Sequence, residues 1–204
     1  MSEQIQSPST GKTLVKVATK QLTPTSDTKV KTITVPRVFI EVIISDSRAI
    51  SAGSQWGHAA VVIDGTVYSR GHEEYVTMPK GVYLNGGTYN RALGPARMGG
   101  QGFRDNAGIV LWVSPREKKV VEDELKRRVQ SDRAHIRKEG EGHSTYSIFD
   151  NSCSSNVADA LELVGILAHD PRWLSFPVTP AELLAVLSKS NRFVKKNYYQ
   201  KKDQ

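Results

Sequence analysis

Short runs of β-branched and other apolar residues dominate the first half of the chain. The run RVFIEVIIS, from Arg37 to Ser45, predicts a buried strand. The runs WGHAAVVI and TVYSR are joined by Asp64-Gly65, and this dipeptide between two such runs is a strong signal for a β-hairpin with a two-residue turn. After a glycine-rich stretch that predicts a loop, GIVLWVS predicts another buried strand from Gly108 to Ser114.

Helical spacing of apolar residues replaces these runs in the second half. Ser114-Pro115-Arg116-Glu117 supplies an N-cap serine, an early proline and a capping-box glutamate, which together predict a helix start. Three apolar residues follow on one face, namely Val121, Leu125 and Val129. A second helix is expected from about Ser152, and a third after Thr179-Pro180-Ala181-Glu182, which also predicts a capping box.

Strands followed by helices predict an α+β domain, with an antiparallel sheet packed on helices. Residues 36–204 are expected to form this single domain, and the final FVKKNYYQ predicts a short strand or an ordered tail. Residues 1–35 are rich in Ser, Thr, Lys and Gln without a sustained apolar period, which predicts a flexible leader. Gly11-Lys12-Thr13 does not complete a phosphate-binding loop, because Gln6 stands where that loop needs a glycine.

The composition limits the partners and cofactors that we expect. A formal charge of +7 indicates an anionic partner, but no nucleic-acid motif accompanies it, so a specific nucleic-acid partner is not expected. No apolar run is long enough to span a bilayer, and no secretory signal opens the chain. The protein is therefore expected to be made in the cytoplasm, with any export by a signal-independent route. A single cysteine excludes an internal disulfide and a Cys-pair zinc site, and we expect no metal or cofactor.

That cysteine, Cys153, stands at the start of the second predicted helix, with Asn151 or Ser152 as its N-cap. Free N–H groups and the helix dipole favour an anion there, so the thiol pKa is expected to fall and the thiolate to act as a nucleophile. The same N–H groups can bind an oxyanion. Burial as a core residue is the alternative reading, because a lone cysteine on an apolar helical stripe is usually structural. Its small polar neighbours favour the nucleophile.

A cysteine nucleophile needs a base, and His58 is the best placed histidine because it enters a predicted strand directly after Trp56-Gly57. The residue that orients His58 should lie on the partner strand of the hairpin. A two-residue turn places Ser69 diagonally across from His58, whereas a one-residue bulge places His72 opposite it. We expect His72, with Glu73 and Ser69 as alternatives. The other three histidines are expected to be solvated: His135, His143 and His169.

The strand-borne His58 in WGHAAVVIDGTVYSRGH, followed about a hundred residues later by Asn151-Ser152-Cys153, resembles the circularly permuted NlpC/P60-like papain superfamily, which includes relatives of lecithin:retinol acyltransferase. In that group the histidine strand precedes the cysteine helix. Tyr146, seven residues before Cys153, matches the aromatic residue often found there. The resemblance spans about residues 37–165. It implies a permuted papain-like fold, with Tyr146, Asn151, Ser152 and Trp56 as oxyanion or substrate residues.

The activity that this resemblance implies is a thiol-dependent attack on an amide, ester or thioester. Bacterial members commonly cleave peptidoglycan peptides, and some are antibacterial effectors delivered by secretion machines, which implies an anionic wall polymer as substrate and an immunity protein as a further partner. Two alternatives keep the same dyad: a lipid acyl hydrolase or transferase, and a protein deamidase. A third is non-enzymatic, namely a basic adaptor with a buried structural cysteine.

Overall fold

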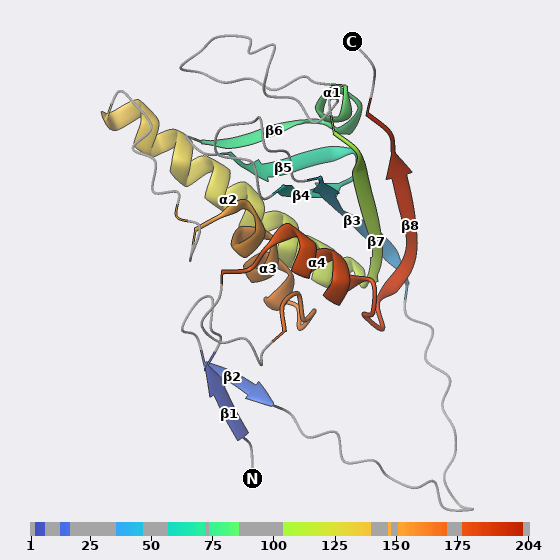
Figure 1. Cartoon of the computed structure of the whole chain (residues 1–204). Helices are drawn as coiled ribbons and strands as arrows, with labels where there is room; N and C mark the ends of the chain where they lie inside the picture. Colours follow the sequence, from blue (N-terminus) through green and yellow to red (C-terminus); the bar gives the residue numbers. More distant parts are fainter. Residues whose placement is uncertain are drawn as a thin grey trace, which may run out of the picture.

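The computed structural model describes residues 3–6, 13–16, 36–46, 57–71, 74–85, 104–139, 147, 151–170 and 177–201. It contains a six-stranded antiparallel sheet in the order β6-β5-β4-β3-β7-β8 and four helices (Figure 1). This arrangement confirms the predicted α+β class. The strands of the sheet are β3 (Val38–Ser45), β4 (His58–Ile63), β5 (Thr66–Arg70), β6 (Tyr75–Pro79), β7 (Asn106–Val113) and β8 (Phe193–Tyr199). The helices are α1 (Lys80–Leu84), α2 (Pro115–Glu139), α3 (Cys153–Glu162) and α4 (Pro180–Leu187).

The hairpin of β4 and β5 has the register that a two-residue turn dictates. Asp64 and Gly65 both have positive φ, of 47° and 77°, as a type I′ turn requires. Ile63 consequently pairs with Thr66, and Ala60 pairs with Ser69. Because alternate residues of a strand share a face, His58 lies on the same face as Ala60 and diagonal to Ser69.

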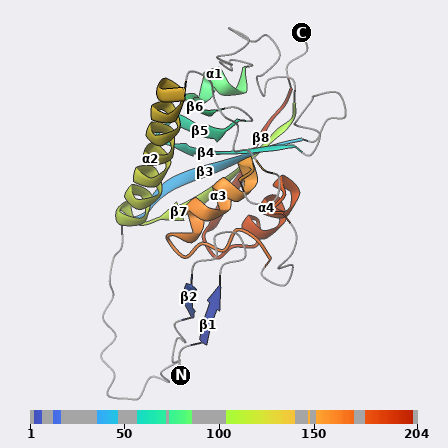
Figure 2. The ribbon, with the colours of Figure 1, turned by 90° about the vertical axis from the view of Figure 1, so that its left-hand side faces the viewer.

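The first face of the sheet is covered by α2, α3 and α4, which the view in Figure 2 shows gathered beside the strands. Its core joins alternate residues of β3, β4 and β7 to the apolar stripe of α2 that the sequence predicts, and Val121, Leu125 and Val129 are all buried. The predicted caps are present at α2, where Ser114 and Glu117 bond each other's backbone N–H groups. At α4, Thr179 caps the helix, but the Glu182 carboxylate accepts the N–H of Asp170 instead of closing a capping box.

The second face carries a smaller apolar cluster that α1 covers through the buried Tyr83. Beside it lies a polar network centred on Glu41, whose carboxylate accepts hydrogen bonds from Lys80, Asn197 and Tyr199 at 2.5 to 2.8 Å. Burial alone would raise the pKa of Glu41, but these three hydrogen bonds and the Lys80 charge hold that pKa below its usual value. The network therefore ties α1 and β8 to the central strand β3.

Three features of the fold differ from what the sequence predicts. Strand β6 and helix α1 occupy residues for which no element is expected, and two short strands, β1 (Glu3–Gln6) and β2 (Thr13–Lys16), pair within the predicted leader. His169 is 5% exposed, and its Nδ1 lies 2.5 Å from a Glu162 oxygen, so its prediction as a solvated residue is wrong. His135 is exposed as expected, and His143 lies outside the described residues. No helix in the described part of the chain is long and apolar enough to cross a membrane.

Replacing Gly108 by alanine tests the packing of the second face. A Cβ atom at Gly108 would overlap with the carboxylate of Glu41, so Gly108→Ala is expected to lower the free energy of unfolding by about 2 kcal/mol or more. Urea unfolding followed by circular dichroism measures this change. Gly81→Ala is the matched control, because nothing lies near a Cβ there and alanine is favoured over glycine in a helix by ~0.5–1 kcal/mol. Equal stability of the two variants would contradict the crowded site at Gly108.

Candidate active site

Cys153 is the first residue of α3, as the sequence predicts, and Ser152 is its N-cap. The hydroxyl of Ser152 accepts the N–H of Ser155, and the hydroxyl of Ser155 accepts the N–H of Ser152. This reciprocal capping box fixes the first turn of the helix. Val157 and Leu161 are buried one and two turns further on and anchor α3 against the sheet. The thiol, whose residue is 4% exposed, is therefore held at the positive end of a helix with a rigid start.

His58 is the first residue of β4, again as the sequence predicts, and Gly57 controls its position. Gly57 has φ of +90°, and a Cβ there would lie 2.6 Å from the carbonyl oxygen of Ser45. Only glycine combines this backbone conformation with such a close approach to β3. Because α3 packs directly against β4, the start of the helix and the start of the strand meet at one edge of the core.

The electrostatics of Cys153 show that the two residues interact. Burial alone would raise the pKa of the thiol, but the charge of His58 and a hydrogen bond to its side chain lower it. The backbone N–H of Ala59 and the hydroxyl of Ser154 also stabilise the thiolate, and together these contacts bring the pKa to about 6. A thiol in this setting is ionised near neutral pH, which distinguishes it from a structural cysteine buried among apolar groups.

Ser69 also contacts His58, with its Oγ 2.7 Å from Nε2 of the imidazole. The sequence offers Ser69 as an alternative under the two-residue turn, and that register is the one present. His72, the residue that we expected in this role, and Glu73 lie outside the described residues.

Tyr83 is a buried residue near Ser69 and is not predicted from the sequence. It is 1% exposed, and Ser69 lies close enough to act on the pKa of its hydroxyl, which has no hydrogen-bond partner of standard geometry among the described residues. Burial raises the pKa of Tyr83, so the phenol stays neutral, while the Ser69 contact opposes that rise. No sequence signal marks Tyr83, because its helix has only five residues and no side-chain cap.

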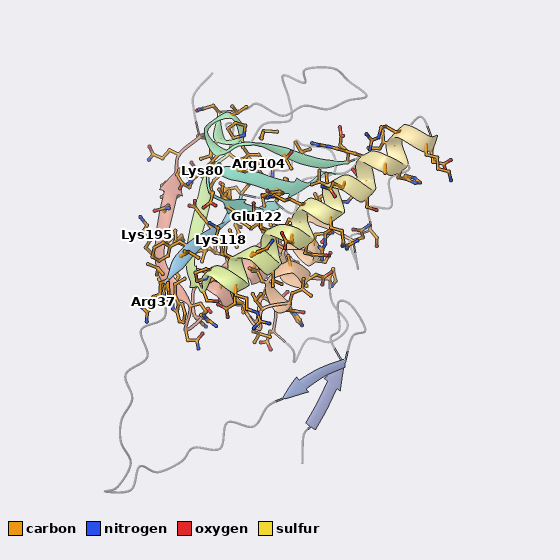
Figure 3. The ribbon with its side chains drawn as sticks, turned by 180° about the vertical axis from the view of Figure 1, so that it is seen from behind. Arg37, Lys80, Arg104, Lys118, Glu122 and Lys195 are labelled. Carbon is orange, nitrogen blue, oxygen red and sulfur yellow. The ribbon has the colours of Figure 1, made fainter. Side chains whose placement is uncertain are left out.

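Arg104 is a second buried polar residue near the site that sequence reasoning does not identify. It is 1% exposed, and its charge acts on the Tyr83 hydroxyl. Its Nη1 donates to the Asp46 carbonyl at 2.8 Å, and its own carbonyl accepts the side-chain N–H of Asn106. Ser45 donates in turn to Asn106 at 2.5 Å. Arg104, labelled in Figure 3, therefore helps to fix the end of β3 and the start of β7 beside the start of β4.

The remaining predicted site residues have different outcomes. The side-chain oxygen of Asn151 accepts a hydrogen bond from Asn156 at 2.9 Å, and Ser152 uses its hydroxyl as the helix cap. These two residues thus shape the loop before Cys153. Trp56 and Tyr146 lie outside the described residues.

A direct titration of the thiol tests this geometry, because the chain has one cysteine. The ultraviolet absorbance of the thiolate, with Cys153→Ala subtracted as the background, is expected to rise with a midpoint near pH 6. His58→Ala removes the charge and the hydrogen bond that lower the pKa, so the midpoint should move up toward that of an ordinary thiol, about 8.5. A midpoint that stays unchanged in His58→Ala would rule out the interaction.

No family model matches the chain, and comparison with curated proteins and with solved structures gives no match either. The function therefore rests on the residues and the geometry of the site itself.

Proposed function

We propose that the protein is a cysteine hydrolase in which Cys153 is the nucleophile and His58 is the general base. The observation that carries this proposal is a buried thiol at a capped helix start beside His58, whose imidazole Nε2 lies 2.7 Å from the Ser69 hydroxyl; the lowered pKa of the thiol supports it. A nucleophile, a base and a residue that orients the base form the arrangement that covalent acyl transfer requires. The order of the histidine strand and the cysteine helix supports a permuted papain-like arrangement of the NlpC/P60 type.

The proposed reaction begins with transfer of the thiol proton to the imidazole. Since Ser69 contacts Nε2, the nitrogen that takes the proton is Nδ1. The thiolate attacks the carbonyl carbon, a C–S bond forms, and the carbonyl electron pair moves onto oxygen. First-turn N–H groups of α3 stabilise that oxyanion. The tetrahedral intermediate then expels the amine, which takes the proton from His58, and leaves a thioester on Cys153.

Hydrolysis of the thioester by water completes the cycle. His58 removes a proton from water, the resulting hydroxide attacks the thioester carbonyl, and the C–S bond breaks. The acid product leaves and the thiolate is restored beside the imidazolium. The Ser69 hydroxyl accepts a hydrogen bond from Nε2–H of His58 throughout, so the ring keeps the orientation that both half-reactions need.

The substrate class that we propose is an amide bond in the peptides of an anionic polymer such as peptidoglycan. The formal charge of +7 supports an anionic partner. Arg37 and Arg192 both stack on Trp112 on the sheet, with distances of 4.7 and 4.0 Å to the ring centre, and Arg192 is also paired with Glu117 at 2.8 Å, which leaves Arg37 as the cation available to an anion there. Figure 3 shows Arg37 and Lys195 near the outer strand β8, which adds a basic surface to that side. We further propose delivery to the periplasm of a target cell and an immunity protein as partner.

Expression with and without the nucleophile tests the function. The wild-type chain is expected to lyse bacteria when directed to the periplasm and to be harmless in the cytoplasm, because the wall substrate lies outside the inner membrane. Cys153→Ser, which keeps the size of the side chain and is a far weaker nucleophile, should abolish lysis and the release of new amino groups from purified peptidoglycan. Equal lysis by wild type and Cys153→Ser at equal protein levels would overturn the proposal.

Loss of the Ser69 hydroxyl is expected to lower activity less than loss of the Cys153 thiol, and to act on kcat more than on KM. Ser69→Ala removes one hydrogen bond to His58, so kcat should fall about tenfold, the equivalent of ~1.4 kcal/mol. KM should change little, because Ser69 acts through His58 and not on the substrate. Ser69→Thr keeps the hydroxyl and is expected to retain more activity than Ser69→Ala. Steady-state kinetics on a peptide substrate measures this effect, and an unchanged kcat in Ser69→Ala would exclude the orienting role.

A further inference from the structure

A cavity of about 330 Å³ lies beside the loop that leads into α3, between the end of β5, the start of β6 and the second half of α2. Three arginines line it, together with one aspartate, one histidine and the asparagine two residues before the nucleophile: Arg70, Arg127, Arg128, Asp132, His135 and Asn151. We call it the arginine pocket. Its volume is at the lower end of the range for pockets that bind small molecules.

The charges around the arginine pocket favour an anion. Asp132 lies 3.8 Å from Arg70 and also accepts the backbone N–H of Tyr75 at 2.8 Å. Outside the lining, Glu124 accepts hydrogen bonds from Arg127 and Arg128, and these bonds, with Arg127 foremost, lower the pKa of Glu124 to about 2. Three guanidinium groups thus face two carboxylates among the described residues, which leaves an excess of positive charge.

The pocket has a fixed wall. Arg70 is 3% exposed, and its guanidinium lies 5.1 Å from the ring centre of Tyr75, which also lines the pocket. Arg128 donates from Nε to Glu124 and from Nη1 to the backbone and side-chain oxygens of Asn156, at 2.9 and 3.0 Å. A buried and an anchored guanidinium lose little freedom when they bind an anion, and planar guanidinium groups match carboxylates bidentately.

The same contacts connect the pocket to the nucleophile. Asn156 belongs to the first turns of α3, accepts a hydrogen bond from the Tyr75 hydroxyl, and donates from its side chain to Asn151 at 2.9 Å. Asn151 lines the pocket and stands two residues before Cys153. A group bound in the pocket therefore lies next to the segment that carries the thiol.

We propose that the arginine pocket binds a carboxylate side chain of the peptide substrate, close to the amide that Cys153 attacks. This inference rests on the proposed function and specifies its substrate: an acidic peptide. A carboxylate held there fixes the register of the peptide on α3 and selects for a bond that neighbours an acidic residue.

Binding to the full chain with Cys153→Ala tests the pocket without any need for activity. The probes are N-acetylglutamate, its neutral isostere N-acetylglutamine and inorganic phosphate. Their binding is monitored through the NMR signals of Arg70, Arg128 and Asn151. N-acetylglutamate is expected to shift these signals and N-acetylglutamine is not. Arg127→Gln should weaken N-acetylglutamate binding by about fivefold, because Arg127 is an exposed charge in the lining.

Arg116→Gln is the matched control, since Arg116 is an exposed arginine of the same helix outside the lining, and it should bind N-acetylglutamate as Cys153→Ala alone does. Equal binding of the acid and its amide, no binding of the acid, or equal weakening in Arg127→Gln and Arg116→Gln would each overturn the proposal. Tighter binding of phosphate than of N-acetylglutamate would overturn the carboxylate assignment. Absence of hydrolysis by the wild type would leave these binding results unchanged, so the two proposals fail separately.

Discussion

The contact between the start of α3 and the start of β4 is the interaction on which the site depends. Apolar residues of both elements share one core, in which Val157 and Leu161 of the helix join Ala59 and Val61 of the strand. The backbone N–H of Ala59 contacts the sulfur of Cys153, and the preceding residue is His58. Ordinary hydrophobic packing thus sets the separation of nucleophile and base, and the low thiol pKa follows from that separation.

Backbone constraints then fix which residue stands behind His58. The positive φ of Gly57 aligns the start of β4 against β3, and the two-residue turn at Asp64-Gly65 sets the register of β5. A slip of one residue would turn Ser69 to the other face of the sheet, away from the imidazole. The 2.7 Å contact is therefore a consequence of a turn that begins six residues after His58 and ends four residues before Ser69.

Much of this arrangement is readable from the sequence because the signals are local. Strand β3, the hairpin, the capped starts of α2 and α3 and the pair of Cys153 and His58 all follow from apolar period, turn residues and caps. Among the described candidates, the hairpin turn also selects Ser69 as the residue that orients His58, whereas the sequence analysis expects His72 in that role. Ser69 stays a proposal for this role, and His72 and Glu73 lie outside the described residues.

Other parts could not be predicted because their causes are distant in the chain. Tyr83 is buried against strands β3, β4 and β5, Arg104 is buried as well, and neither carries a local pattern that indicates burial. His169 looks like a loop histidine until α3 brings Glu162 beside it. The arginine pocket likewise needs β5, α2 and the loop before α3 to meet, and a charged stretch of α2 read alone predicts only a solvated helix face.

The polar residues of the two faces have different consequences for function. On the second face, burial holds Tyr83 neutral, and hydrogen bonds from Lys80, Asn197 and Tyr199 hold Glu41 ionised, so both groups keep one protonation state while His58 exchanges its proton. On the first face, Asn156 joins Tyr75, Arg128 and Asn151 in one network at the start of α3. A movement of the dyad of Cys153 and His58 would break hydrogen bonds of these buried polar groups, and buried polar groups are costly to leave unpaired. The polar residues on both faces of the sheet therefore favour one fixed orientation of the dyad. Selection among substrates should accordingly come from the fixed shape and charge around α3, and not from rearrangement of the dyad itself.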